Sequence, residues 1–192
     1  MTDMKKERLL LHSCCGPCST AVIERLAEDW ELTVFFFNPN ISGEEEYALR
    51  RDEQKRFITE YNASAKKSVL YMEGDYRPEL FFNAVSGHEQ DPEGGERCTL
   101  CFLLRLSETA RLAKELGFDA FDTTLSVSPH KNYDIISAIG KECSDKYGVR
   151  YPAGNYKKKE GFKRSIELAE EYGLYRQDFC GCIYSKRGVQ PR

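Results

Sequence analysis

Short apolar runs alternate with longer amphipathic stretches along this sequence of 192 residues. The apolar runs have the length of buried strands and end at turn-forming residues, whereas the amphipathic stretches repeat apolar residues at helical spacing. This pattern predicts strands at 9–12, 32–37, 69–72 and 120–125, with a shorter strand at 149–151. It predicts helices at 17–28, 44–61, 78–85, 98–116, 132–147 and 160–172. Strands that alternate with helices indicate an α/β fold with a doubly wound, mainly parallel sheet and flanking helices.

Length and composition favour one domain over two. With 41% hydrophobic and 31% charged residues, the chain can bury one sizeable core. No internal repeat or long linker divides it, so we expect residues 1–192 to form a single α/β domain. The apolar residues 9–11 are too few for a signal peptide or a membrane span, and we therefore expect a cytoplasmic protein with no membrane partner.

The eight cysteines are clustered, which in a reducing compartment indicates metal or redox chemistry. Cys14 and Cys15 end the first predicted strand, where parallel sheets bind their ligands. Cys98 and Cys101 begin a predicted helix, and helix N-termini lower thiol pKa values. Together these four residues make a complete set of thiolates, which suits either a tetrahedral zinc ion or a [4Fe-4S] cluster.

A further cysteine motif, Cys180-Gly181-Cys182, lies later in the chain. Two thiols separated by one glycine would form a small, strained and easily reduced disulfide, or bind a second metal ion. Near the N-terminus, Cys15-Gly16-Pro17-Cys18 also matches the active-site tetrapeptide of thioredoxins, between a strand and a helix. A thioredoxin-like dithiol oxidoreductase is therefore an alternative, although the other cysteines would be superfluous in one.

A net charge of −3 gives no overall basic field, so any RNA contact must come from a local patch. The candidate patch combines basic residues with the aromatic side chains of Tyr156 and Phe162, a mixture that holds phosphates and stacks unpaired bases. Its basic members are Lys157, Lys158, Lys159, Lys163 and Arg164. A solvated helix face is the alternative explanation of this charge.

Six short motifs follow one another along the chain: His12-Ser13-Cys14-Cys15-Gly16-Pro17-Cys18; Asn38-Pro39-Asn40-Ile41 with Glu46-Tyr47; Gly94-Gly95-Glu96-Arg97-Cys98 with Cys101-Phe102; Thr123-Thr124-Leu125; Ser128-Pro129; and Tyr175-Arg176-Gln177 with Cys180-Gly181-Cys182. In this order they resemble the QueH family of epoxyqueuosine reductases. The resemblance covers about residues 9–186, nearly the whole chain.

The resemblance implies a cobalamin-independent enzyme that reduces epoxyqueuosine to queuosine in the tRNA anticodon, with electrons from an unidentified donor. It implies a [4Fe-4S] cluster whose ligands map to Cys14, Cys15, Cys98 and Cys101, and a redox-active catalytic pair at Cys180 and Cys182. It also suggests an additional iron ion. For that ion, Asp178 and Cys18 are the further candidate ligands beside the cysteine pair.

Two related questions stay open at this stage. The first is whether the chain is instead a zinc-stabilised RNA-binding module without catalysis, which would use the same cysteines. The second is the proton donor, for which the candidates are equally eligible: His130, Tyr175, Asp178 and Tyr184.

The expected architecture is a HUP or PP-loop-like three-layer sandwich. PP-loop enzymes carry a glycine-rich phosphate loop after the first strand, whereas here a cysteine pair and Gly16-Pro17 occupy that place. The fold therefore does not imply nucleotide hydrolysis.

Overall fold

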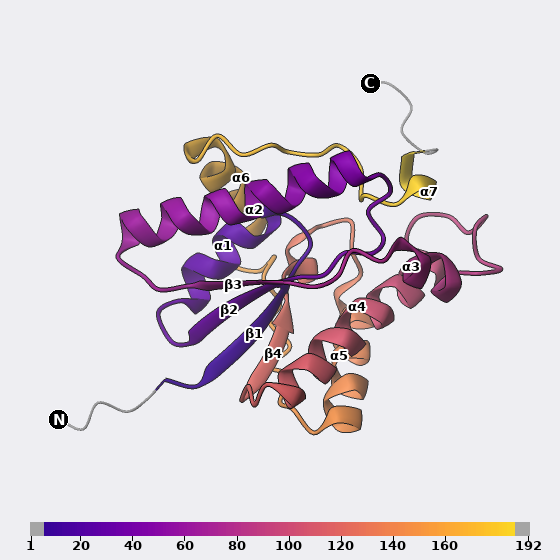
Figure 1. Cartoon of the computed structure of the whole chain (residues 1–192), viewed down its shortest axis with the longest axis horizontal. Helices are drawn as coiled ribbons and strands as arrows, with labels where there is room; N and C mark the ends of the chain where they lie inside the picture. The colour runs from indigo at the N-terminus through magenta and orange to yellow at the C-terminus, as the bar shows by residue number, and fades with distance from the viewer. Residues whose placement is uncertain (1–5, 187–192) are drawn as a thin grey trace.

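A computed structural model describes residues 6–186. Four parallel strands form one sheet in the order β3-β2-β1-β4 (Figure 1). Their bounds are β1 (Arg8–Ser13), β2 (Glu31–Phe36), β3 (Leu70–Glu73) and β4 (Ala120–Thr123). The chain runs from β1 outward to β3 and then returns to place β4 on the other side of β1. The strand order therefore reverses beside β1, and ligands bind at such a switch point in doubly wound sheets.

Helices cover both faces of the sheet (Figure 1). Leu9 and Leu11 of β1 pack into one apolar cluster, with α1 (Gly16–Leu26), α2 (Glu44–Ala65) and α6 (Gly161–Glu171). Leu10 points the other way, into a second cluster with α4 (Glu96–Glu115) and α5 (Tyr133–Tyr147). This alternation along one strand explains the run of consecutive apolar residues, and the predicted three-layer α/β fold is confirmed.

Local signals set several element ends. Pro17 stands in the first turn of α1, where its missing N–H costs nothing. The Asn132 side chain caps α5 by accepting a hydrogen bond from the Asp134 N–H at 2.9 Å. At the other end of α5, Gly148 adopts the left-handed conformation, with a φ of 66°. Pro17 and Asn132 thus fix where two loops at the carboxyl ends of the strands end, and Gly148 starts a loop at the opposite edge of the sheet.

The structure differs from the predicted elements in a few places. The strand predicted at 120–125 stops at Thr123, because the Thr123 hydroxyl accepts a hydrogen bond from the Leu125 N–H at 3.2 Å and starts the 3-10 helix η1 (Thr124–Val127). The strand predicted at 149–151 is a single bridge between Ala120 and Arg150. The short helices α3 (Pro78–Ala84) and α7 (Ile183–Lys186) complete the fold, and α7 was not predicted. No helix within residues 6–186 is long and apolar enough to cross a membrane.

Candidate metal and substrate site

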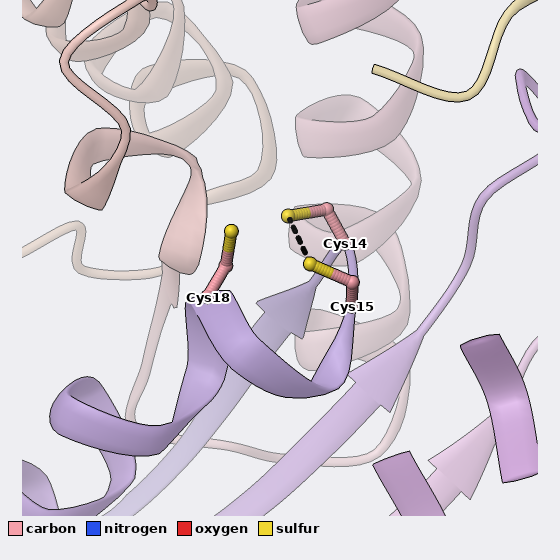
Figure 2. Close-up of side chains that lie close together, drawn as sticks. All are labelled: Cys14, Cys15 and Cys18. Atoms are coloured by element: carbon pink, nitrogen blue, oxygen red, sulfur yellow. Dashed lines mark hydrogen bonds between the residues drawn. The ribbon is translucent and has the colours of Figure 1, made fainter. Parts of the chain in front are cut away.

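Cys14, Cys15 and Cys18 form a first cysteine group at the carboxyl end of β1 (Figure 2). Their sulfur atoms all lie within 4.8 Å of one another, and the sulfurs of Cys14 and Cys15 are 3.8 Å apart. The sharp turn between β1 and α1 produces this cluster, because it brings the strand end and the first helical turn to one point. Cys18 was not among the four predicted cluster ligands, yet it completes this group.

The first cysteine group stabilises a thiolate. Hydrogen bonds from the Cys15 and Cys18 thiols, helped by the charges of Lys131 and Arg105, hold the pKa of Cys14 well below its ordinary value. The same hydrogen bond with Cys14 raises the pKa of Cys15 to about 12. A thiolate stabilised at the end of a strand is a ready ligand for a soft metal ion.

Cys98, Cys101, Cys180 and Cys182 form a second cysteine group, which lines a cavity of about 80 Å³ that we call the thiol cavity. The first two residues lie in the first turns of α4, and the other two lie in the segment between α6 and α7. Burial raises the pKa of Cys101 to about 12. The thiol cavity is too small for a nucleoside, so it suits an inorganic group.

Arg50 of α2 holds the part of the second group that contains Cys180. This arginine is only 2% exposed. Its guanidinium donates hydrogen bonds to the carbonyl oxygens of Cys180 at 3.2 Å and Phe179 at 3.3 Å, and to the Glu46 carboxylate at 2.6 Å. The backbone beneath it requires glycine, since Gly181 has a φ of 122° and a Cβ there would lie 3.1 Å from the guanidinium.

Arg97 plays the same part for Cys98. It is 3% exposed, and its guanidinium donates to the carbonyl oxygens of His88, Glu89 and Asp91 in the loop before α4. The loop, wound around this side chain, also places the Gly94 N–H 3.2 Å from the Cys98 sulfur, to which it donates. Sequence reasoning missed both arginines, although the position of Arg97 directly before a cysteine was a usable signal.

The eight cysteines all carry free thiols, so the disulfide predicted between Cys180 and Cys182 is absent. Both side chains line the thiol cavity, but the rest of their surroundings differ. Cys182 packs in an apolar cluster with Phe81 and Val85, whereas Cys180 lines both the thiol cavity and the larger cavity described next. Cys143 of α5 is buried in an apolar cluster and belongs to neither group.

A larger cavity of about 570 Å³, which we call the open cavity, adjoins both cysteine groups. Its size is that of a site for a nucleoside or a small cofactor. It shares Glu93, His130, Lys131 and Cys180 with the thiol cavity, so the two spaces meet there. Its other lining residues include Cys14, Cys18, Phe162, Arg176, Gln177 and Asp178. Asp178, a candidate iron ligand, therefore lies on the wall of the open cavity.

Gln177 connects this wall to the first cysteine group. Its side-chain N–H donates to the Cys15 sulfur at 2.9 Å, while its buried carbonyl oxygen has no hydrogen-bond partner among the described residues. An unpaired buried acceptor is costly unless a ligand supplies the missing donor. Gln177 thus has one bond to a thiol and one free acceptor beside the open cavity.

The basic residues predicted to bind RNA differ in how far they are already engaged. Arg164 makes a bidentate ion pair with Glu24 at 2.9 and 2.7 Å, and Lys163 lies 3.6 Å from Glu160. Lys157 donates to a backbone carbonyl, whereas Lys158 and Lys159 are exposed and form no ion pair with any residue from 6 to 186. The part of the patch open to a phosphate is therefore centred on Lys158 and Lys159.

The predicted cluster ligands are thus divided between two groups, with Cys14 and Cys15 in the first and Cys98 and Cys101 in the second. Residues 9–188 match the model of the family described as epoxyqueuosine reductase QueH. The chain belongs to this family. Its members are oxidoreductases, as predicted, and membership argues against the thioredoxin-like and zinc-module alternatives.

Named QueH relatives are similar over most of their length. The epoxyqueuosine reductase QueH of Streptococcus pyogenes serotype M1 is 42% identical over 179 residues, which cover 93% of this chain and 70% of that protein. The QueH of Staphylococcus epidermidis is 38% identical over 191 residues, covering 97% of this chain and 80% of that protein.

A solved structure shares the fold. It is the U34-tRNA thiolase NcsA from Methanococcus maripaludis with its [4Fe-4S] cluster, which matches with a TM-score of 0.56 and 16% identity. The match covers 95% of this chain and 62% of the thiolase chain, less than two thirds of its length. At this identity the comparison shows the architecture alone, and it agrees with the three-layer sandwich observed here.

Proposed function

We propose that this chain reduces epoxyqueuosine to queuosine in the tRNA anticodon, with an iron–sulfur centre bound by its own cysteines and without cobalamin. The observation that carries the proposal is the gathering of two cysteine groups at the switch point of a chain that belongs to the QueH family. The thiolase with the same architecture holds a [4Fe-4S] cluster and acts on tRNA, which agrees with this assignment.

The residues present fit such a centre. Thiolates are the ligands of iron–sulfur clusters, and buried cations balance their charge. Arg105 is 1% exposed and lines the thiol cavity, where one of its terminal nitrogens has no hydrogen-bond partner among the described residues. The side-chain oxygen of Asn40, on the same wall, is also unpaired within that part of the chain. Unpaired donors and acceptors beside free thiols indicate a polar, charged occupant.

The two groups contain more thiols than one cluster requires, since a [4Fe-4S] cluster takes four. In this proposal Cys14, Cys15, Cys98 and Cys101 bind the cluster, and Cys180 and Cys182 form a redox-active pair. Cys18 and Asp178 would then bind the additional iron ion. The closeness of Cys18 to Cys14 supports a role for Cys18 as a metal ligand.

The open cavity would receive the modified nucleoside. An anticodon loop is single-stranded, so its base can enter the cavity without the cost of leaving a duplex. Phe162 offers a ring for stacking on the cavity wall, and Lys158 and Lys159 would bind backbone phosphates nearby. When bound, the iron centre supplies single electrons and a Lewis acid that favours cleavage of carbon–oxygen bonds.

Among the proton donors considered from the sequence, His130 is the best placed. It is exposed and lines both the thiol cavity and the open cavity. Tyr175 instead donates to the Glu46 carboxylate at 3.4 Å, and Tyr184 packs near Phe81. Asp178 lines the open cavity alone and is assigned in this proposal to the additional iron ion. We therefore assign proton delivery to His130.

The test is turnover by protein purified without oxygen. Iron, zinc and acid-labile sulfide are measured first, and the reduced protein is then incubated with tRNA that contains epoxyqueuosine. Mass spectrometry of the digested nucleosides should show queuosine forming without added cobalamin. Zinc as the only bound metal, or iron-loaded protein that leaves the epoxide intact under a strong reductant, would contradict the proposal.

A further inference from the structure

Lys131 lies where three cavities meet. It lines the thiol cavity, the open cavity and a polar cavity at the start of α5. Its ammonium is close to both cysteine groups: burial acts to lower the pKa of Lys131, but the thiols of Cys180, Cys14 and Cys18 outweigh burial and raise it. One long side chain thus reaches the space between the candidate metal ligands and the candidate nucleoside site.

The backbone beneath Lys131 is held in place. Its carbonyl oxygen accepts a hydrogen bond from the Lys157 ammonium at 3.0 Å, and its N–H donates to the Ser128 carbonyl at 3.3 Å. The next residue, Asn132, caps α5. This anchoring fixes the backbone from which the ammonium reaches the junction.

The Lys131 ammonium has no carboxylate within ion-pair distance in residues 6–186. Lysines removed from water are normally paired with an acid. The groups that face this one are thiols and a second cation, Arg105, while the Glu93 carboxylate lines the same two cavities and forms no ion pair with Lys131. Its position, half-buried on the walls of three cavities, therefore indicates a partner that is an anionic or strongly polar ligand.

We propose that the Lys131 ammonium binds the epoxide oxygen of tRNA-bound epoxyqueuosine and stabilises the negative charge that this oxygen gains during reduction. The inference rests on the proposed function and assigns a catalytic residue within it. The reaction consumes two electrons from an external reductant and two protons from solvent, which His130 delivers in the proposed function. Both carbon–oxygen bonds of the epoxide break, the carbon–carbon double bond forms and the oxygen leaves as water. Lys131 is protonated before and after, since its role is a fixed charge at the developing oxyanion.

A different role for the same charge would be to neutralise the thiolates around the metal. A cation that did only this would affect metal binding, and it would not distinguish an epoxide from an alkene. The two roles therefore predict different results for a variant that keeps the size of the side chain and removes the charge.

The experiment compares Lys131→Met and Lys131→Arg with the wild type, and uses Lys141→Met on the exposed face of α5 as the matched control. Each protein is purified without oxygen, assayed for iron and sulfide, reduced with excess dithionite and mixed with epoxyqueuosine tRNA for a single turnover. Lys131→Met should retain its iron and react about 10²–10³-fold more slowly. Lys131→Arg should recover part of the rate, and Lys141→Met should match the wild type.

A binding measurement on the unreduced, iron-loaded proteins is independent of turnover. The wild type should bind tRNA with epoxyqueuosine about tenfold more tightly than the same tRNA with queuosine, because only the epoxide offers the oxygen. Lys131→Met should bind both equally. An unchanged rate, a retained preference or a loss of iron in Lys131→Met would overturn the inference. A wild type that forms no queuosine would instead refute the proposed function itself.

Discussion

The two cysteine groups are built in different ways. The first comes from one short stretch, where a strand turns directly into a helix and the backbone alone brings three sulfurs together. The second joins two segments that are far apart in the chain, and buried arginines hold each segment through its carbonyl oxygens. Local geometry therefore suffices for the first group, whereas the second depends on a few long-range side chains.

The largest expected effect follows from removing a proposed metal ligand of the first group. Cys14→Ala eliminates the thiol whose pKa is held lowest, so the protein should lose more than about half of its iron and all measurable reduction. Cys143→Ala, at a buried cysteine outside both groups, should keep the iron of the wild type. Iron analysis after anaerobic purification checks both variants, and an unchanged iron content in Cys14→Ala would exclude Cys14 as a ligand.

The second group should respond differently if Cys180 and Cys182 are redox-active. Cys182→Ala should retain tRNA binding and most of its iron, and its rate of epoxide reduction should fall by about 10²-fold or more. Nucleoside analysis and a tRNA binding assay on the same preparation separate the two properties. Full activity in Cys182→Ala would show that the pair has no catalytic role.

Arg50→Met tests whether the second group depends on its arginine. The substitution leaves two carbonyl oxygens and the Glu46 carboxylate without their buried partner, which should cost about 3 kcal/mol of folding free energy. Hydrogen exchange should accelerate at residues 179–182. The neighbouring Arg51→Met is the matched control, since Arg51 is more exposed and pairs with Asp52, and its loss should cost less than about 1 kcal/mol. Equal losses from both variants would contradict this role of Arg50.

A pH titration tests whether a buried carboxyl in β4, the strand beside β1, holds its proton in the folded protein. Asp122 of β4 accepts hydrogen bonds from Tyr156 at 2.7 Å and Gly154 at 3.1 Å, and its burial raises its pKa to about 6. Between about pH 4 and pH 6 the unfolded carboxyl is ionised while the folded one holds its proton. The free energy of unfolding should therefore fall across this window as the pH rises, by up to about 3 kcal/mol.

Denaturation at several pH values checks this expectation. Asp122→Asn should flatten the dependence in that window, whereas Asp145→Asn, on the exposed face of α5, should leave it as in the wild type. If the wild type shows no loss of stability between these pH values, Asp122 does not carry its proton in the folded protein.

The smallest effect concerns RNA binding. Replacing Lys157, Lys158 and Lys159 with glutamine should weaken tRNA binding and make it less sensitive to salt. The logarithmic slope should decrease by about 0.7 for every phosphate that the variant no longer neutralises. Lys141→Gln serves as the control on another face. An unchanged affinity and slope would show that the patch is an ordinary solvated surface.

The sequence predicted the fold class, most helices and strands, and the cysteines of both groups. It succeeded where the signal was local, as in the strand that ends at two cysteines and the helix that starts at Pro17. It failed where distant contacts decide the outcome. Arg50 lies in a helix rich in charge, so nothing in its spacing distinguishes a buried guanidinium from a solvated one.

The site itself was predicted as a set of ligands, without their grouping. Spacing could not show that Cys18 joins Cys14 and Cys15, because a tetrapeptide that begins a helix is equally compatible with a dithiol pair. It could not place Lys131 either, since a lysine in a loop normally points into solvent. Only the folded chain shows that three cavities meet at this side chain.

The separation of the two cysteine groups along the chain also determines when, during synthesis of the protein, the proposed metal centre can be loaded. The ribosome completes the first group at Cys18 and reaches Cys180 only after the intervening chain has been made, which takes on the order of ten to thirty seconds at usual elongation rates. At the start of that interval the early thiols have neither their later neighbours nor β4 beside them. The proposed centre can therefore be completed only after Cys180 and Cys182 have been made, and the cell must keep the early thiols reduced until then.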